Sequence, residues 1–212
     1  MHLSDVNKRF LEGMHTAVRR TWMKYALRGV SGHDAYDRLD RAYRVPDPWA
    51  MDSDRERFRF VETNRAIVDA FGRIGSMLEI GCGEGHQSTY LVGLCDRLTG
   101  IDVSATAVGR AQKRLPGVEF SAGDIFAQSW VEERSCFDVV LGLEMLYYLS
   151  DIPKTLAAMT RLARRGCMVS YFAPAERRMG RFVSTIPGVR RHSFRYDRSG
   201  EAEWTVVWWP AT

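Results

Sequence analysis

Apolar residues in the first 45 positions recur at steps of three and four, which predicts helices. The repeat is carried by Leu3, Phe10, Leu11, Met14, Val18 and Trp22. Gly29 and Gly32 interrupt it, and a second helix is expected from Ser31 to Tyr43. The prolines in segment 45–48 then force an extended turn, because proline disfavours a helical conformation in the residue before it. A third helix is expected from Asp52 or Ser53 to Phe71.

After Gly75 the pattern changes to strands that alternate with helices. Apolar runs predict five strands, at 77–80, 98–101, 118–120, 137–143 and 166–172. Helices are expected from a glycine-rich turn to about Leu94, from Ser104 to Arg114 and over 152–163. The run 137–143 is almost wholly apolar, as a strand buried on both faces requires. This alternation indicates a parallel sheet with helices on both faces.

The last part of the chain follows another pattern. Two β-rich runs, 192–196 and 203–209, flank Asp197-Arg198-Ser199-Gly200, which is typical of a hairpin. Strand alternation places Trp204 and Trp208 on one face and Trp209 on the other. The sequence therefore predicts an α/β fold with a doubly wound, mostly parallel, seven-stranded sheet that finishes in an antiparallel hairpin. We expect residues 1–50 to form an N-terminal helical lid and residues 51–212 to form the main domain.

Composition narrows the class of protein. The 212 residues are 45% apolar and 26% charged, which is typical of one globular domain. No apolar stretch is long enough for a transmembrane helix, and the N-terminus lacks an apolar signal core, so we expect a cytoplasmic protein. The four cysteines show no metal-ligand spacing, so no metal site is expected. Residues 161–198 carry ten arginines and two acidic residues, which suits either an anionic partner or a solvated rim.

A glycine-rich turn, 81–85, joins the first strand to a helix, and Asp102 ends the second strand. Glycines permit a positive φ and a close approach of a ligand to the backbone. A carboxylate at the end of the second strand can accept hydrogen bonds from both hydroxyls of a ribose. Together these features predict a nucleoside site. A dinucleotide would require a glycine where His86 stands, so S-adenosylmethionine fits better.

The segments LEIGCGEG, IDVS, GDI and FDVVLGLEMLYYL follow in this order. In order and spacing they resemble the class I S-adenosylmethionine-dependent methyltransferases, which have a Rossmann-like methyltransferase fold. Within that superfamily, Asp47-Pro48-Trp49, the helix from Glu56 to Thr63, and Glu144-Met145-Leu146-Tyr147-Tyr148-Leu149 are most similar to the nodulation protein S group. That group N-methylates a chito-oligosaccharide. The match covers roughly residues 45–172, and the first 45 residues resemble no family.

The resemblance implies a role for each matched residue. It places Asp102 on the ribose and Asp124 on the adenine amino group, and Glu79 supports the loop or the ligand amino group. The remaining residues implied to bind the cofactor are Gly81, Cys82, Gly83, Gly85, Val103, Ile125, Leu143, Trp49 and Arg59. Two departures concern the substrate side: Arg164-Arg165-Gly166 replaces the usual Pro-Gly-Gly turn, and the last helix is expected to be reduced.

Glu144 is the best candidate for a catalytic group, because it ends the fourth strand, where open α/β sheets bind their ligands. It could orient an amine or accept its proton, or it could only bind the backbone or the cofactor. Tyr147 is the second candidate, and one of Tyr147 and Tyr148 is expected to line the pocket while the other packs. No base is assigned among the histidines.

The leading hypothesis is methyl transfer from S-adenosylmethionine to an amine or hydroxyl of a small molecule, such as a carbohydrate or glycoconjugate. A nucleic-acid methyltransferase that uses residues 161–198 is an alternative, although nucleic acid is not the favoured partner. The fourth strand ends in Leu-Glu-Met-Leu and lacks the Asn-Pro-Pro-Tyr type of motif that holds a flipped base. A non-catalytic cofactor-binding scaffold is a further alternative. A homodimer is compatible with the sequence, and no membrane partner is expected.

Overall fold

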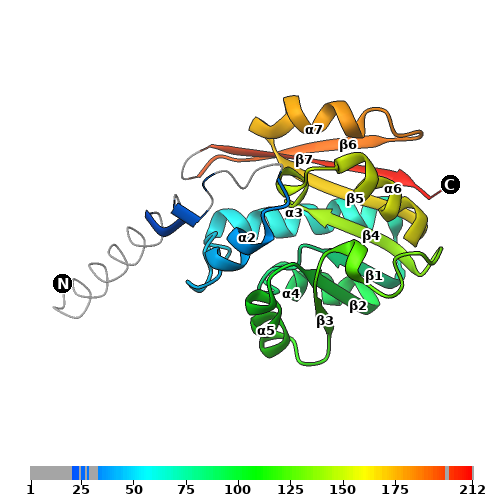
Figure 1. The fold of residues 1–212 in the computed structure, drawn as a ribbon. Coiled ribbons are helices and arrows are strands. Elements are labelled where there is room, and N and C mark those ends of the chain that lie inside the picture. The colour runs from blue at the N-terminus through cyan, green and yellow to red at the C-terminus, as the bar shows by residue number, and fades with distance from the viewer. Residues whose placement is uncertain (1–20, 24, 27, 29–32, 199–200, 212) are drawn as a thin grey trace.

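The structure is a computed structural model, and it describes residues 21–23, 25–26, 28, 33–198 and 201–211. A seven-stranded sheet in the order β3-β2-β1-β4-β5-β7-β6 crosses the molecule (Figure 1). Strands β1 to β5 run parallel, and β7 pairs antiparallel with both β5 and β6. The strands are β1 (Ile74–Ile80), β2 (Cys95–Asp102), β3 (Glu119–Ala122), β4 (Phe137–Leu143), β5 (Ala163–Phe172), β6 (Arg190–Tyr196) and β7 (Ala202–Pro210).

Helices cover both faces of this sheet (Figure 1). They are α2 (Tyr36–Ala42), α3 (Asp54–Phe71), α4 (Ser88–Leu91), α5 (Ala105–Arg114), α6 (Ile152–Leu162) and α7 (Glu176–Val183). Short 3-10 turns lie at Val92–Leu94, Ile125–Ala127, Leu146–Tyr148 and Ala173–Ala175. Side chains cap three of the helices: Ser53 caps α3, Ser104 caps α5 and Asp151 caps α6, each accepting a hydrogen bond from a backbone N–H of the first turn.

Two apolar layers hold the helices on the sheet. Alternate side chains of the central strands divide between them, so that Leu78 enters one layer and Met77 the other. Helices α6 and α7 complete the first layer, which includes Trp209. Helices α3 and α4 complete the second layer, which includes Trp204, and Trp208 packs against it. The predicted division of the three tryptophans between the faces is therefore confirmed.

Most predicted elements are confirmed, and β4 has the predicted bounds. Strands β1, β2 and β5 each begin three residues earlier than predicted. Three further differences concern the helices. The helix expected after the glycine turn ends as α-helix at Leu91 and continues as a 3-10 turn to Leu94. Helix α2 is shorter than predicted, and its expected cap, Ser31, lies outside the described residues, as do residues 1–20 of the first predicted helix. Helix α7 was missed, because five of its eight residues are charged or glycine and the apolar repeat is short.

Segment 33–53, which contains α2, crosses the carboxyl ends of the strands. Asp34 accepts hydrogen bonds from the backbone N–H and the hydroxyl of Ser150, and Ser104 donates its hydroxyl to Asp40 over 2.6 Å. The backbone N–H of Asp47 donates to Glu84 over 2.9 Å. We call residues 33–53 the strap. Within the described residues, no helix combines the length and apolar character needed to cross a bilayer.

Candidate functional site

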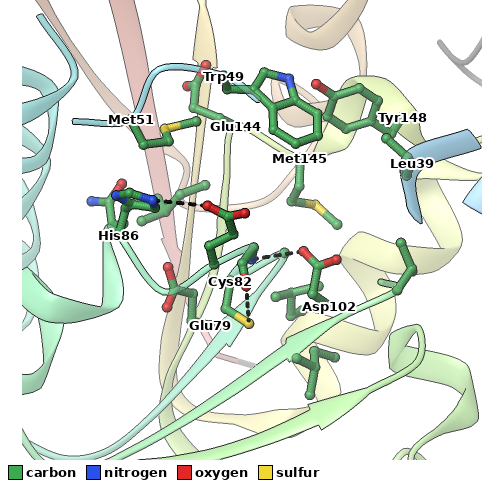
Figure 2. Close-up of a pocket in the computed structure, with 18 of the residues that line it drawn as sticks. Leu39, Trp49, Met51, Glu79, Cys82, His86, Asp102, Glu144, Met145 and Tyr148 are labelled. Atoms are coloured by element: carbon green, nitrogen blue, oxygen red, sulfur yellow. Dashed lines mark hydrogen bonds and ion pairs between the residues drawn. The ribbon is translucent and has the colours of Figure 1, made fainter. Parts of the chain in front are cut away.

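A cavity of about 360 Å³ opens at the carboxyl ends of β1, β2 and β4, beneath the strap (Figure 2). This is the point where the strand order reverses between β1 and β4, which is the usual ligand position in an open α/β sheet. The side chains of Glu79, Cys82 and Asp102 lie on its floor, whereas Trp49 and Tyr148 lie across its roof (Figure 2). The geometry therefore brings together segments that are far apart in the sequence.

The glycine-rich turn forms part of the floor. Gly81, Gly83 and Gly85 all have positive φ, at 79°, 54° and 76°, where a side chain would be strained. A Cβ on Gly81 would lie 2.9 Å from Met145, and one on Gly83 would lie 2.8 Å from the hydroxyl of Tyr43. Gly81, Cys82 and Gly83 line the cavity. Gly85 does not: a Cβ there would press on the backbone of Ala111 in α5, so its glycine is needed for helix packing.

Asp102 is held by two backbone donors. Its Oδ2 accepts the N–H of Gly83 and its Oδ1 accepts the N–H of Ser104, each over 2.9 Å. Burial raises the pKa of Asp102 to about 6, against the opposing effect of these hydrogen bonds. Each carboxylate oxygen keeps a second lone pair, so the group can still accept hydrogen bonds from a diol. Val103 lines the cavity beside it.

Asp124 and Ile125 line the next part of the wall. The Oδ1 of Asp124 accepts the N–H of Ala127 over 2.9 Å, which fixes the carboxylate at the start of a 3-10 turn. Tyr36, from the strap, places its hydroxyl beside the carboxylates of Asp124 and Asp34, to either of which it can donate. Burial and these two carboxylates raise the pKa of Tyr36, so its hydroxyl remains a proton donor. The strap therefore contacts the residue that sequence reasoning assigns to an adenine amino group.

Charged and polar side chains meet at the other end of the floor. The buried guanidinium of Arg59 donates to Glu56 over 2.7 Å and to Oε1 of Gln87 over 2.9 Å. The Nε2 atom of Gln87 is buried and has no hydrogen-bond partner in the structure, and Gln87 lines the cavity. Glu79 accepts a hydrogen bond from Ser88, and burial raises its pKa to about 7. The Gln87 amide and the Arg59 guanidinium can donate hydrogen bonds to a ligand carboxylate, and the Glu79 carboxylate can accept them from a ligand ammonium group.

Glu144 follows β4 and has a φ of 57°, in the left-handed region that a non-glycine residue rarely adopts. Its backbone N–H donates to the carbonyl of Ser170 over 3.1 Å, and its Oε1 accepts the hydroxyl of Ser170 over 2.8 Å. Its Oε2 accepts the hydroxyl of Tyr147. Burial raises the pKa of Glu144, and this effect outweighs that of the Arg59 charge and of the two hydrogen bonds. Backbone strain of this kind is often found at functional sites.

Tyr147 and Tyr148 both line the cavity, with ring centroids 5.3 Å apart. The prediction that only one of them would do so is wrong, because both residues lie in a 3-10 turn at 146–148 from which both side chains reach the cavity. Burial raises the pKa of Tyr147 well above its ordinary value, and Glu144 adds to this, so the Tyr147 hydroxyl stays protonated. Trp49 lies against Tyr43, with centroids 4.9 Å apart, and forms the roof (Figure 2).

Asp47, Glu84 and His86 bring their ligand atoms within 4.8 Å of one another, a spacing that a metal ion could use. Two guanidinium groups already neutralise this cluster: Arg110 donates to the carboxylate of Glu84, and Arg114 lies 3.0 Å from Nε2 of His86. Burial acts to raise the pKa of Glu84, but hydrogen bonds from His86, Arg110 and the Asp47 backbone lower it overall. We interpret the cluster as the connection that fastens the strap to the glycine turn.

The structure thus places every residue of the sequence-predicted site except Gly85 at one cavity. Sequence reasoning missed Tyr36, Tyr43, Gln87 and Ser170. Gln87 follows the glycine turn by two residues, so the turn was a signal for it. The other three carried no signal, because they reach the site through tertiary packing.

Comparison with protein families is decisive for classification. The family model for "Nodulation protein S (NodS)" matches residues 31–173, about two thirds of the chain. The chain belongs to the nodulation protein S family. The match ends one residue after β5, so α7 and the β6–β7 hairpin lie outside it.

Relatives within the family are about one third identical to this chain. Nodulation protein S of Rhizobium tropici is 32% identical over 137 residues, which cover 64% of this chain and 57% of that protein. Nodulation protein S of Bradyrhizobium diazoefficiens is 34% identical over 142 residues, which cover 65% and 63%. The chain therefore spans about six tenths of the length of these relatives.

Solved structures confirm the fold. The N-methyltransferase NodS from Bradyrhizobium japonicum WM9, in complex with S-adenosyl-L-homocysteine, has a TM-score of 0.69 at 24% identity, over 84% of this chain and 99% of that one. Magnesium protoporphyrin IX methyltransferase from Synechocystis PCC 6803 has a TM-score of 0.56 at 16% identity, over 93% of this chain and 97% of that one. The sheet described above is thus the Rossmann-like methyltransferase fold that the sequence predicted.

Proposed function

We propose that this chain binds S-adenosylmethionine and transfers its methyl group to an amine of a chito-oligosaccharide or a similar amino-sugar. The observation that carries the proposal is the cavity itself. One floor combines two glycines without room for a Cβ, a buried aspartate at the end of β2, and a carboxylate at the end of β4. Membership of the nodulation protein S family, and a family member in complex with S-adenosyl-L-homocysteine, support the same conclusion.

The residues present fit this cofactor. Gly81 and Gly83 line the cavity with backbone that carries no side chain, and Asp102 can accept hydrogen bonds from both ribose hydroxyls. The unpartnered Nε2 of Gln87 and the guanidinium of Arg59 would hold the carboxylate of the methionine part, and Glu79 would hold its ammonium group. When bound, S-adenosylmethionine supplies an electrophilic methyl group on a good leaving group.

The chain's own contribution to the reaction is to position and deprotonate the acceptor. Glu144 directs its carboxylate into the cavity, where it can attract an ammonium group and then accept the proton that the amine must lose. Its raised pKa makes it a better base than an exposed carboxylate. Tyr147 and Ser170 fix both oxygens, so the orientation of Glu144 is set before the acceptor arrives.

An amine is favoured over a hydroxyl because the described residues that act on Glu144 include no stronger base. A sugar hydroxyl has a high pKa and needs such a group, whereas a neutral amine needs only a proton acceptor. The described groups that act on the Glu144 carboxyl are Arg59, Tyr147, Ser170 and Glu56. Arg59 is permanently charged and Tyr147 stays protonated, so neither is a base.

The basic region 161–198 does not favour nucleic acid as the acceptor. Several of its arginines hold the fold together by binding backbone carbonyls or nearby carboxylates. These are Arg161, Arg164, Arg165, Arg178, Arg191 and Arg195. Arginines engaged in this way are less available for phosphates. This supports the interpretation of the region as a solvated rim.

The test is calorimetric titration of the protein with S-adenosyl-L-homocysteine, followed by transfer of a radiolabelled methyl group to glucosamine oligomers. We expect micromolar binding that Asp102→Ala abolishes, and turnover that Glu144→Gln reduces by about a hundred-fold. A Thr160→Ser variant, far from the cavity, serves as the folded control. Absence of binding by folded wild-type protein would refute the cofactor assignment. Binding without transfer to any amine would favour a scaffold instead.

A further inference from the structure

Two aromatic rings lie at the acceptor end of the cavity and have no role in the mechanism above. Phe172 ends β5, and Trp204 stands directly opposite it on β7. Their ring centroids are 6.0 Å apart, and both line the same cavity as Glu144. Trp204 continues into a stacked contact with Phe194, at 5.9 Å and 28°. We call Phe172 and Trp204 the platform, and a third ring, that of Phe194 on β6, packs against Trp204.

Phe172 is unusually exposed for its size. Its side chain is 37% exposed, whereas Trp204 is 3% exposed. The other large apolar side chains that are exposed in the described part of the chain are Tyr25, Val61, Val68 and Val92, and none of them lines this cavity. Exposed apolar surface at the rim of a cavity is typical of a binding site. Phe172 thus offers an open ring face next to the proposed reaction centre.

Glu144, the proposed base, lies close to Phe172 along the sheet. Glu144 is bound to Ser170 through both its backbone and its carboxylate, and Ser170 precedes Phe172 by two residues on the same strand. Residues two apart on a strand lie on the same face, about 7 Å apart. A group held at Glu144 and a ring held on Phe172 are therefore separated by about one sugar unit.

Charged groups line the same cavity as the platform and bear on the kind of acceptor. Arg55 and Glu56 line the cavity, and they form an ion pair of 3.1 Å in which Arg55 is half-exposed. A sugar ring has an apolar C–H face that packs on an aromatic ring, and hydroxyls at its edge that need hydrogen-bond partners. A lipid chain would desolvate these charged groups without offering them any hydrogen-bond partner. The chemistry of the wall thus suits a sugar.

We propose that Phe172, supported by the buried ring of Trp204, forms a second acceptor subsite, which stacks the sugar ring adjacent to the one that is methylated. The inference rests on the proposed function, because it takes Glu144 as the reaction centre. It also goes beyond the family match, which ends at residue 173 and does not include Trp204. The subsite makes the enzyme selective for oligomers over a single amino-sugar.

The test compares glucosamine with a glucosamine tetramer that has one free amine. In wild-type protein the tetramer should have the lower KM. Phe172→Ala should raise the KM of the tetramer by about three- to ten-fold, the scale of one aromatic contact, and leave that of the monomer unchanged. Phe172→Tyr keeps the ring and should behave as wild type. Val68→Ala, on the outer face of α3, controls for the loss of an exposed apolar side chain.

A second readout does not depend on turnover. Calorimetric titration of the fully N-acetylated tetramer in the presence of S-adenosyl-L-homocysteine should show binding that Phe172→Ala weakens by the same factor. Equal affinity of wild type and Phe172→Ala for the tetramer overturns the subsite and leaves the proposed function in place. Failure of the wild type to bind S-adenosyl-L-homocysteine overturns the proposed function instead. If an acyl amine binds more tightly than the tetramer, Phe172 and Trp204 bind a lipid chain, and the proposed sugar subsite is also overturned.

Discussion

The affinity for S-adenosyl-L-homocysteine should depend steeply on pH, because both carboxylates on the cavity floor must be ionised to bind it. Burial raises the pKa of Asp102 to about 6 and that of Glu79 to about 7. In the proposed complex, ionised Asp102 would accept hydrogen bonds from the ribose, and ionised Glu79 would hold an ammonium group. Protonation of either residue removes an acceptor and leaves a donor facing a donor.

These two pKa values give the size of the effect. At pH 8 both groups are ionised in the free protein. At pH 5 the ionised fraction of Asp102 is about one tenth and that of Glu79 about one hundredth, so Kd rises by about a thousand-fold, or about 4 kcal/mol. A plot of log Kd against pH should be flat above pH 7, have a slope of about −1 between pH 7 and 6, and approach a slope of about −2 below pH 6.

The assay is isothermal titration from pH 5 to 8 at constant ionic strength. Glu79→Gln should remove the change near pH 7, and Asp102→Asn the change near pH 6. Thermal melting at each pH separates binding from unfolding. Folded-state pKa values above those of the unfolded chain mean that these two groups stabilise the fold at low pH, and that this stabilisation is lost as pH rises towards 7. A Kd that is constant between pH 5 and 8 in protein that remains folded would refute the reasoning.

Three further outcomes are expected. Ser170→Ala removes the hydroxyl that donates to Glu144, so kcat should fall by about ten-fold with little change in KM, and Ser170→Thr should restore kcat. An unchanged kcat in steady-state assays would show that Glu144 is fixed without Ser170. Gly83→Ala places a methyl group 2.8 Å from a tyrosine hydroxyl at a φ of 54°, so unfolding in urea should show a loss of at least about 1 kcal/mol together with weaker cofactor binding. Thr160→Val leaves the indole N–H of Trp209 without its hydrogen-bond acceptor. This should lower the free energy of unfolding by about 1 kcal/mol, while the affinity for S-adenosyl-L-homocysteine stays the same.

The sequence predicted the parts of this protein that depend on local chemistry. Ser53 and Ser104 cap the helices that their positions suggested, since a capping side chain needs only the next three residues. The glycine turn and Asp102 were predictable for a similar reason: strand, turn and strand end are close in the fold and nearly adjacent in sequence. The strand alternation along β7 also predicted which face each of its three tryptophans occupies.

What the sequence could not predict comes from contacts between distant segments. The left-handed backbone of Glu144 depends on Ser170, 26 residues away, and no local pattern indicates it. Spacing alone also could not show that Gly85 serves α5 while Gly81 and Gly83 serve the cavity. The role of Tyr36 at Asp124 requires the path of the strap, which crosses four strand ends before it reaches α3.

The strap has a consequence for the order of events during turnover. The floor beneath it is covered by Leu39 and Tyr43, which are almost fully buried, whereas the opposite end of the cavity opens beside Phe172. In the proposed complex, a nucleoside beneath the strap would leave only when the contacts of the strap to Ser104, Glu84 and Ser150 separate, whereas a sugar beside the exposed Phe172 would not disturb them. This arrangement imposes a compulsory sequence, in which the methyl donor is first on and its demethylated product last off. Product inhibition by S-adenosyl-L-homocysteine would then be competitive with the donor and non-competitive with the acceptor.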